Sequence, residues 1–160
     1  MITFIQTGGT IDKDYPKTKG GYAFEIDEPA VKRILEKLDP DLECEIVSAL
    51  RKDSLDMTEE DRKKIVEFCK EAENDRIIIT HGTDTMLDTA KVLAALDKTI
   101  VITGAMRPER FTNSDAPVNI GMAIAAVQTL TPGVYIAMHG RVLSWQGCKR
   151  DENGRFIKIE

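Results

Sequence analysis

Two threonines with glycine neighbours are the residues of this chain best suited to nucleophilic chemistry. Thr10 lies in TGGTI at 7–11, and Thr83 lies in HGTDTM at 81–86, where Asp84 follows it. A threonine hydroxyl is a weak nucleophile unless a neighbouring base or cation activates it. Adjacent glycines let a substrate approach closely and leave backbone N–H groups free to stabilise an oxyanion. These features favour an acyl-transfer site.

Glycine-rich turns have other uses, and a nucleotide site is the first of them. TGGTI lacks the pattern G-x-G-x-x-G, and the chain holds no G-x-x-x-x-G-K-[ST]. A phosphate cradle also needs a helix that begins at the glycines, whereas the polar stretch 12–16 follows here. A nucleotide site is therefore disfavoured. Two structural alternatives stay open: a tight turn with positive φ at Gly8 and Gly9, and capping of a helix by Thr83 or Asp84.

Alternating strand and helix patterns place both threonines at strand ends. Short apolar runs predict strands at 2–6, 42–49, 76–80, 99–103 and 133–138. Helical patterns cover 28–38, 58–73, 85–96 and 116–130. This order indicates an α/β fold, with a mainly parallel sheet flanked by helices. Ligands of such sheets bind beyond the carboxyl ends of the strands, where both motifs fall.

Two of the predicted helices carry capping signals at their starts. Asp27 precedes the helix at 28–38 and is its expected N-cap, with Pro29 in the first turn. Thr58 and Asp61 resemble a capping box at the start of the helix at 58–73.

Composition narrows the range of partners and compartments. The chain has 160 residues, a net charge of −5, 42% hydrophobic and 31% charged residues, which suits one domain of ordinary composition. An acidic chain without a Lys/Arg cluster argues against nucleic acid, and no apolar stretch reaches bilayer length. The sequence shows no signal peptide, and its three cysteines predict reduced thiols, so we expect a cytoplasmic protein. The two histidines have no metal-ligand neighbours at zinc spacing, so we expect no metal.

The paired threonine motifs are also the signature of a known family. TGGTI and HGTDTM together resemble the bacterial-type L-asparaginases, which are threonine amidohydrolases. Three further segments fall in the family's order and spacing: KDSLDMT (52–58), VITGAMRP (101–108) and SDAPVNI (114–120). The resemblance covers nearly the whole chain and implies the catalytic-domain fold of that family.

The resemblance implies roles for individual residues. Thr10 is similar to the family's nucleophile, which attacks the side-chain amide carbon, and Tyr22 matches the tyrosine of a loop that closes over the site. Thr83 and Asp84 match the second Thr-Asp pair, in which the aspartate also holds the substrate's α-amino group. Ser54 resembles the residue that holds the α-carboxylate.

The mechanism that we expect also uses the backbone and a closing loop. Backbone N–H groups near Gly9 or Gly82 would stabilise the oxyanion. The loop 12–23 would close over the site, with Gly20 and Gly21 as hinges. The mechanism requires no cofactor.

A catalytic lysine completes the family's site, and here two residues compete for its position. An ungapped comparison places Arg150 there, and a shift of one residue places Lys149; we favour Lys149. Ser144 stands where the family has an acidic residue. The choice matters because arginine stays charged and cannot act as a base, whereas a desolvated lysine can.

Together these features predict a single asparaginase-like catalytic domain over 1–160, without the family's C-terminal domain. The predicted activity is release of ammonia from L-asparagine. A glutaminase or amidotransferase-type amidase is one alternative, and an inactive amino-acid-binding module is another. The surface that a missing domain would leave exposed predicts a homo-oligomer.

Overall fold

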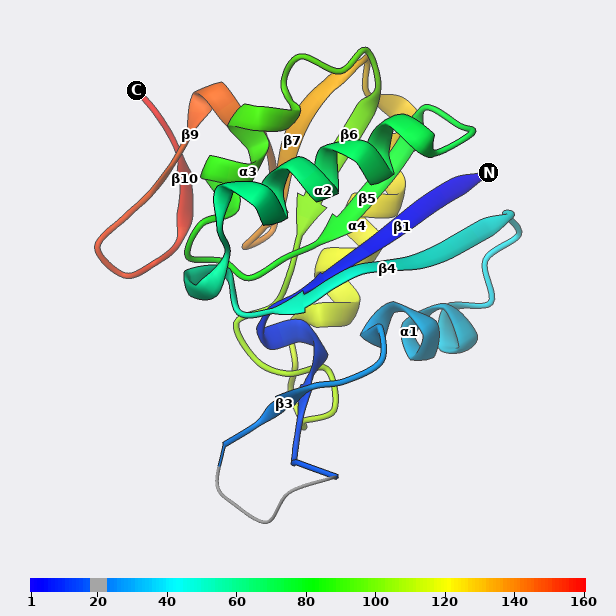
Figure 1. The fold of residues 1–160 in the computed structure, drawn as a ribbon, viewed down its shortest axis with the longest axis vertical. Coiled ribbons are helices and arrows are strands. Elements are labelled where there is room, and N and C mark those ends of the chain that lie inside the picture. Colours follow the sequence, from blue (N-terminus) through cyan, green and yellow to red (C-terminus); the bar gives the residue numbers. More distant parts are fainter. Residues whose placement is uncertain (18–22) are drawn as a thin grey trace.

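A six-stranded sheet forms the centre of the computed structural model, which describes residues 1–17 and 23–160 (Figure 1). The strand order is β4-β1-β5-β6-β7-β8. The bounds are β1 (Ile2–Gly8), β4 (Cys44–Lys52), β5 (Arg76–Thr80), β6 (Thr99–Thr103), β7 (Gly133–Met138) and β8 (Arg141–Ser144). Neighbouring strands pair in parallel, except that β7 and β8 are antiparallel. The predicted α/β fold with a mainly parallel sheet is confirmed.

The register of the sheet aligns the apolar runs of its central strands. Ile5 pairs with Ile79, Ile79 with Ile102, and Ile102 with Ile136. These side chains are all buried. Strands that are covered on both faces need such continuous β-branched runs, which is why the five-residue strands β5 and β6 read so clearly in the sequence.

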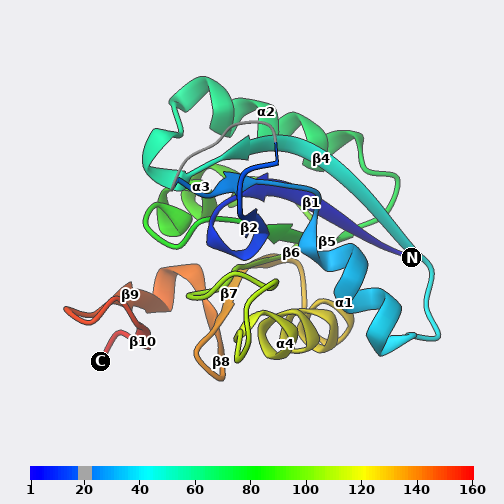
Figure 2. The ribbon, with the colours of Figure 1, turned by 90° about the horizontal axis from the view of Figure 1, so that it is seen from below.

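Helices cover both faces of this sheet (Figure 2). Their bounds are α1 (Ala30–Leu38), α2 (Glu59–Glu71), α3 (Met86–Leu93) and α4 (Ala116–Thr129). α2 and α3 lie on one face, and α1 and α4 lie on the other. Because successive side chains of a strand point to opposite faces of the sheet, each central strand contributes side chains to two hydrophobic clusters. Ile77 and Ile79 pack under α2 and α3, whereas Ile78 packs under α1 and α4.

The helix starts follow the prediction in one case and depart from it in the other. Thr58 and Asp61 form the capping box of α2, with the Asp61 N–H donating to Thr58 Oγ1 at 3.2 Å. The prediction that Asp27 caps α1 is wrong. The N–H of Ala30 donates instead to Asp12 Oδ1 at 2.8 Å, and Asp27 pairs with Lys17 at 2.5 Å. A tertiary contact thus replaces the local cap.

Several short elements surround the sheet without having been predicted. The antiparallel pairs are β2 (Lys13–Asp14) with β3 (Glu25–Ile26), and β9 (Cys148–Arg150) with β10 (Phe156–Lys158). The 3₁₀ turns are η1 (Thr10–Asp12), η2 (Ser54–Asp56) and η3 (Trp145–Gly147). Elements of two or three residues are too short to show a hydrophobic period. Figure 1 shows the β2–β3 hairpin projecting from the body of the molecule.

No helix within the described part of the chain combines the length and the apolar character that crossing a bilayer requires.

Candidate active site

The turn after β1 takes its shape from two glycines. Gly8 and Gly9 have φ angles of 111° and 84°, which L side chains rarely adopt. The Gly9 N–H donates to the Lys52 carbonyl oxygen at 3.0 Å, so the turn is tied to the end of β4. Thr10 follows at the start of η1 and is half-buried. The predicted positive-φ turn is confirmed.

Gly9, Gly82 and Ser54 bring three separate turns into contact. A Cβ atom on Gly9 would lie 2.4 Å from the Cα atom of Gly82, and a Cβ atom on Gly82 would lie 2.7 Å from Ser54 Oγ. Ser54 is fully buried. Its hydroxyl has no hydrogen-bond partner among the residues that the structure describes. The ends of β1, β4 and β5 therefore converge around one unpaired hydroxyl.

His81 supports the second threonine turn from inside the protein. Its Nδ1 lies 2.6 Å from the Gly82 carbonyl oxygen, and its Nε2 lies 2.7 Å from Thr89 Oγ1. Burial lowers the pKa of His81 to about 4, so its ring is neutral at pH 7. A neutral ring that faces a carbonyl oxygen through Nδ1 carries its proton there, and Nε2 then accepts from the Thr89 hydroxyl. His81 is thus a structural residue that fixes the turn.

Thr83 and Asp84 do not cap the following helix, so the capping alternative is wrong. α3 begins at Met86 with Thr85 at its N-cap, and the N-cap side chain makes no capping bond. The Thr85 hydroxyl donates instead to the Ser54 carbonyl oxygen at 2.9 Å, which ties the second threonine turn to η2. Thr83 is half-buried and Asp84 is exposed. Both side chains stay outside the helix start.

Arg150 is the cation that the structure brings to Asp84. Its Nη1 lies 2.9 Å from Asp84 Oδ1. Two further contacts hold the guanidinium: Nε donates to the Gly154 carbonyl oxygen at 3.2 Å, and the group lies 5.6 Å from the centre of the Phe156 ring. Arg150 is therefore fixed by the β9–β10 hairpin before any substrate arrives.

Lys149 is not brought to Asp84. It pairs with Ile157 in the β9–β10 hairpin and is exposed. Successive residues of a strand point to opposite faces, so a hairpin that aims Arg150 at Asp84 turns Lys149 away.

A polar cavity lies between the β2–β3 hairpin and the end of β4. Its volume is about 720 Å³, and Lys13, Arg51 and Asp53 are among the residues that line it. Lys13 Nζ lies 2.6 Å from Asp53 Oδ2 and closes one wall. The hydrogen bond from Lys13 holds the pKa of Asp53 below its usual value, so Asp53 is ionised at neutral pH. The cavity has charges of both signs, which suits a zwitterionic ligand.

Most of the predicted site residues therefore meet at one edge of the sheet. They are Thr10, Gly9, Ser54, Gly82, Thr83 and Asp84. Tyr22, Gly20 and Gly21 lie outside the described residues. The sequence analysis did not identify Thr85 and Asp12 as part of the site. Their hydrogen bonds join residues that are far apart in the sequence, so no local motif indicates them. The sequence offered Arg150 as an alternative to Lys149 without favouring it. The register of the β9–β10 hairpin decides which of the two side chains faces Asp84, and the turn at 151–155 has no sequence pattern that would predict this register.

Within the described ranges, no group of three or more His, Cys, Asp or Glu residues is arranged to hold a metal ion. The three cysteines are free thiols, and burial raises the pKa of Cys69 to about 12, which makes it unreactive.

Comparison with known proteins identifies the family of the chain. The sequence profile of the family "Asparaginase, N-terminal" matches residues 1–156. The chain therefore belongs to the asparaginase family, and the resemblance inferred from the motifs is confirmed.

Two relatives that are about equally identical to this chain are named for different activities. The L-asparaginase of Thermococcus kodakarensis is 32% identical over 149 residues, which are 89% of this chain and 45% of that protein. A glutamyl-tRNA(Gln) amidotransferase subunit from Methanococcus maripaludis is 31% identical over 150 residues, which are 87% of this chain and 35% of that protein. The chain thus spans about half or less of the length of the curated relatives it matches.

Solved structures show the same fold. The thermostable L-asparaginase from Thermococcus kodakarensis superposes with a TM-score of 0.84 at 28% identity, over 99% of this chain and 51% of that one. A probable cytoplasmic L-asparaginase from Campylobacter jejuni gives a TM-score of 0.75 at 30% identity, over 93% of this chain and 49% of that one.

Proposed function

We propose that the chain hydrolyses the side-chain amide of L-asparagine, with Thr10 as the nucleophile. One observation carries the proposal: the turns that hold Gly9, Gly82 and Ser54 are in contact around a buried hydroxyl that lacks a partner in the described structure. Membership of the asparaginase family supports the same chemistry.

In the proposed first half-reaction the Thr10 hydroxyl oxygen attacks the amide carbon. The C–O bond forms, the C–N bond breaks, and the hydroxyl proton leaves with the amine as ammonia. Water then attacks the acyl-threonine ester, which releases aspartate and restores the hydroxyl. The N–H of Gly9 already donates to Lys52, so the N–H groups of Thr10 and Gly82 are the candidates for the oxyanion.

The substrate's ends would be held by the other residues of the site. Ser54, as a buried donor without a partner in the described structure, suits an α-carboxylate. Asp84 is a carboxylate suited to the α-amino group, and Thr83 lies beside it to position the attacking water. Tyr22 is proposed to contact Thr10. No step requires a cofactor or a metal.

The activating cation remains a choice between Arg150 and Lys149. The contact with Asp84 favours Arg150 as an electrostatic partner that orients the carboxylate and stays charged throughout. The proton acceptor is then a hydroxyl or water rather than this side chain. Lys149 would reach Asp84 only if the β9–β10 hairpin shifted by one residue.

The test is ammonia release from L-asparagine and L-glutamine. We expect the wild type to release ammonia from asparagine, and Thr10→Ala and Thr83→Ala to abolish release while keeping the native fold by circular dichroism. Thr131→Ala is the matched control, because Thr131 is exposed and precedes β7 at the opposite edge of the sheet. Full activity in folded Thr10→Ala would exclude the proposed nucleophile.

A glutaminase or amidotransferase-type amidase is the second candidate. The match to an amidotransferase component, at an identity close to that of the asparaginase match, favours it. Faster release of ammonia from glutamine than from asparagine would select this function.

An inactive amino-acid-binding module is the third candidate, and the pairing of Arg150 with Asp84 favours it because arginine cannot accept a proton. A thermal shift with aspartate in the absence of ammonia release would select it. The homo-oligomer and the cytoplasmic location stay predictions.

A further inference from the structure

Asp12 is a buried carboxylic acid two residues after the proposed nucleophile, and the mechanism does not use it. Its side chain is 1% exposed, and Thr10 and Asp12 belong to the same 3₁₀ turn, η1. Oδ1 accepts the N–H of Ala30 at 2.8 Å, whereas Oδ2 has no hydrogen-bond partner within residues 1–17 and 23–160. A buried carboxylate with a single hydrogen bond is unfavourable, so this position calls for an explanation.

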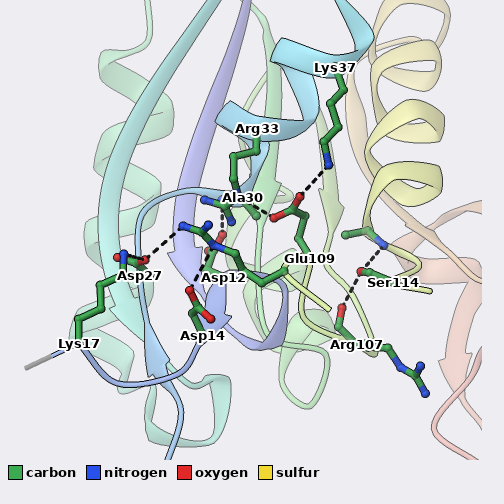
Figure 3. A network of polar contacts seen from close by, with 12 residues as sticks. Asp12, Asp14, Lys17, Asp27, Ala30, Arg33, Lys37, Arg107, Glu109 and Ser114 are labelled. Atoms are coloured by element: carbon green, nitrogen blue, oxygen red, sulfur yellow. Dashed lines mark hydrogen bonds and ion pairs between the residues drawn. The ribbon is translucent and has the colours of Figure 1, made fainter. Parts of the chain in front are cut away.

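Asp12 joins three segments that surround Thr10. Its N–H donates to the Gly9 carbonyl oxygen at 3.2 Å, and its own carbonyl oxygen accepts the N–H of Asp27 at 2.9 Å. Its side chain holds the first turn of α1 through Ala30. Residues 12 and 27, both labelled in Figure 3, are also the two ends of the β2–β3 hairpin. Asp12 therefore fixes the base of the hairpin against the turn that contains Thr10.

Groups from several elements face this carboxyl group. They are Gln6 from β1, the Ala30 N–H and Arg33 from α1, and Arg51 from β4. Arg33 is already engaged, because its Nε lies 2.7 Å from Glu109 Oε2 (Figure 3). The Gln6 amide is engaged as well: Nε2 donates to the Asp27 carbonyl oxygen at 2.8 Å, and Oε1 accepts from Ser48 at 2.6 Å. The neighbours thus give a negative charge on Asp12 only partial compensation.

We propose that Asp12 is a positioning residue for Thr10, and that loss of its proton loosens the clamp that holds the Thr10 turn, the hairpin base and α1 together. Burial raises the pKa of Asp12 to about 7, and this outweighs the hydrogen bond from Ala30, the polar interaction with the Gln6 side chain and the attraction of Arg33 and Arg51. The neutral acid avoids the cost of an isolated buried charge. The carboxylate needs water or new donors, and the η1 turn must open to supply them.

The pKa values of the two histidines are both shifted toward acid. Burial lowers the pKa of His81 to about 4 and lowers that of His139, which moves both away from pH 7 toward acid. The comparison of the wild type with Asp12→Asn therefore decides whether a titration near neutral pH that reaches Thr10 belongs to Asp12.

The first experiment follows backbone amide signals by NMR between pH 5 and pH 9, in the whole chain. In the wild type we expect Thr10, Asp27 and Ala30 to shift together with a common midpoint of about 7. Asp12→Asn keeps a carbonyl oxygen for Ala30 and has no titratable proton, so the common titration should vanish. Asp14→Asn, on the adjacent hairpin strand, is the matched control and should keep it. A common titration that persists unchanged in folded Asp12→Asn would overturn the proposal.

The second experiment rests on the proposed amidase activity. If only the neutral acid presents Thr10 correctly, kcat/KM of the wild type relative to Asp12→Asn falls about tenfold per pH unit above the midpoint. A ratio that is independent of pH would contradict this. Absence of ammonia release at every pH would overturn the proposed function, and the NMR titration would still decide whether Asp12 controls the turn.

Discussion

Two regions flank Thr10, and they are held together by different means. On one side the turns of Gly9, Gly82 and Ser54 meet through backbone contacts that leave no room for a side chain. On the other side the β2–β3 hairpin is attached through one buried acid, ion pairs and exposed rings. We expect the first region to be rigid, because backbone segments in such close contact can hardly move without overlap. The second is held by groups whose interactions pH and salt can weaken. We call the first region the fixed wall and the second the adjustable wall, and Thr10 lies between them.

The largest effect on stability should come from adding a side-chain atom where the turns of the fixed wall are in contact. Gly9→Ala adds a Cβ atom that would lie 2.4 Å from Gly82, at a φ of 84°. We expect the free energy of unfolding to fall by about 3 kcal/mol or more, because strain and overlap add. Urea denaturation measures it.

The matched control separates the overlap from the strain. Gly140 has a φ of 73°, and a Cβ atom there would meet nothing within 4 Å. Gly140→Ala should cost about 1 kcal/mol, which is the strain alone. Equal losses in the two variants would mean that the contact between the turns does not matter.

The next largest effect on stability should come from Asp12 in the adjustable wall, and it should depend on pH. The pKa of Asp12 in the folded chain is raised from 3.8 to about 7, so folding takes up a proton in that interval. The stability that the neutral acid provides is complete below about pH 4, declines as the pH rises, and is lost above about pH 7. Asp12→Asn has no such decline, so its free energy of unfolding at pH 8 should exceed that of the wild type by on the order of 4 kcal/mol. Urea titrations of both proteins at pH 5 and pH 8 measure the difference; a constant difference would refute the assignment.

Much of this arrangement could be predicted from the sequence, because its parts are local. Buried parallel strands need continuous β-branched runs, so RIIIT and TIVIT predicted β5 and β6 to the residue. The capping box of α2 lies within four adjacent residues and was equally readable. The glycine turns that converge on Ser54 followed from the rule that strand ends share one edge of the sheet.

The adjustable wall could not be predicted, because its contacts join residues that are distant in the sequence. Ala30 is capped by Asp12, 18 positions earlier, and nothing in the local pattern prefers it to Asp27. Likewise, Arg150 meets Asp84 across 66 positions, and which face of β9 points inward depends on the turn that precedes β10. Tertiary contacts override local preference in both places.

Arg150, which pairs with Asp84 beside the fixed wall, should contribute to activity. Removal of the Arg150 side chain leaves the Asp84 carboxylate without its partner at 2.9 Å, so kcat/KM for asparagine should fall about 100-fold. Lys149→Ala, which changes the neighbouring cation and keeps the same net charge as Arg150→Ala, should retain activity within about twofold. A steady-state ammonia assay compares them. The reverse order of effects would show that Lys149 completes the site and that the hairpin shifts in the active form.

The smallest effect should come from the outer attachment of the hairpin. Arg110 Nε lies 3.2 Å from Asp14 Oδ2, and its Nη2 lies 3.7 Å from Asp27 Oδ2. The rings of Tyr15, Phe24 and Phe111 pack with centroids 5.3 to 5.9 Å apart. These groups are partly exposed, so water and salt weaken their ion pairs.

Arg110→Ala should therefore lower the free energy of unfolding by less than about 1 kcal/mol, and the loss should shrink in 1 M NaCl. Lys63→Ala removes an ion pair that is more exposed still and is the control for a general charge effect. Urea denaturation at low and high salt measures both variants. We expect Arg110→Ala to change the stability little but to shift the midpoint of the Asp27 amide titration. Arg110 contacts the Asp27 carboxylate, and the Asp27 N–H donates to the Asp12 carbonyl oxygen. A loss of several kcal/mol that salt leaves unchanged would instead place the hairpin with the rigid part of the molecule.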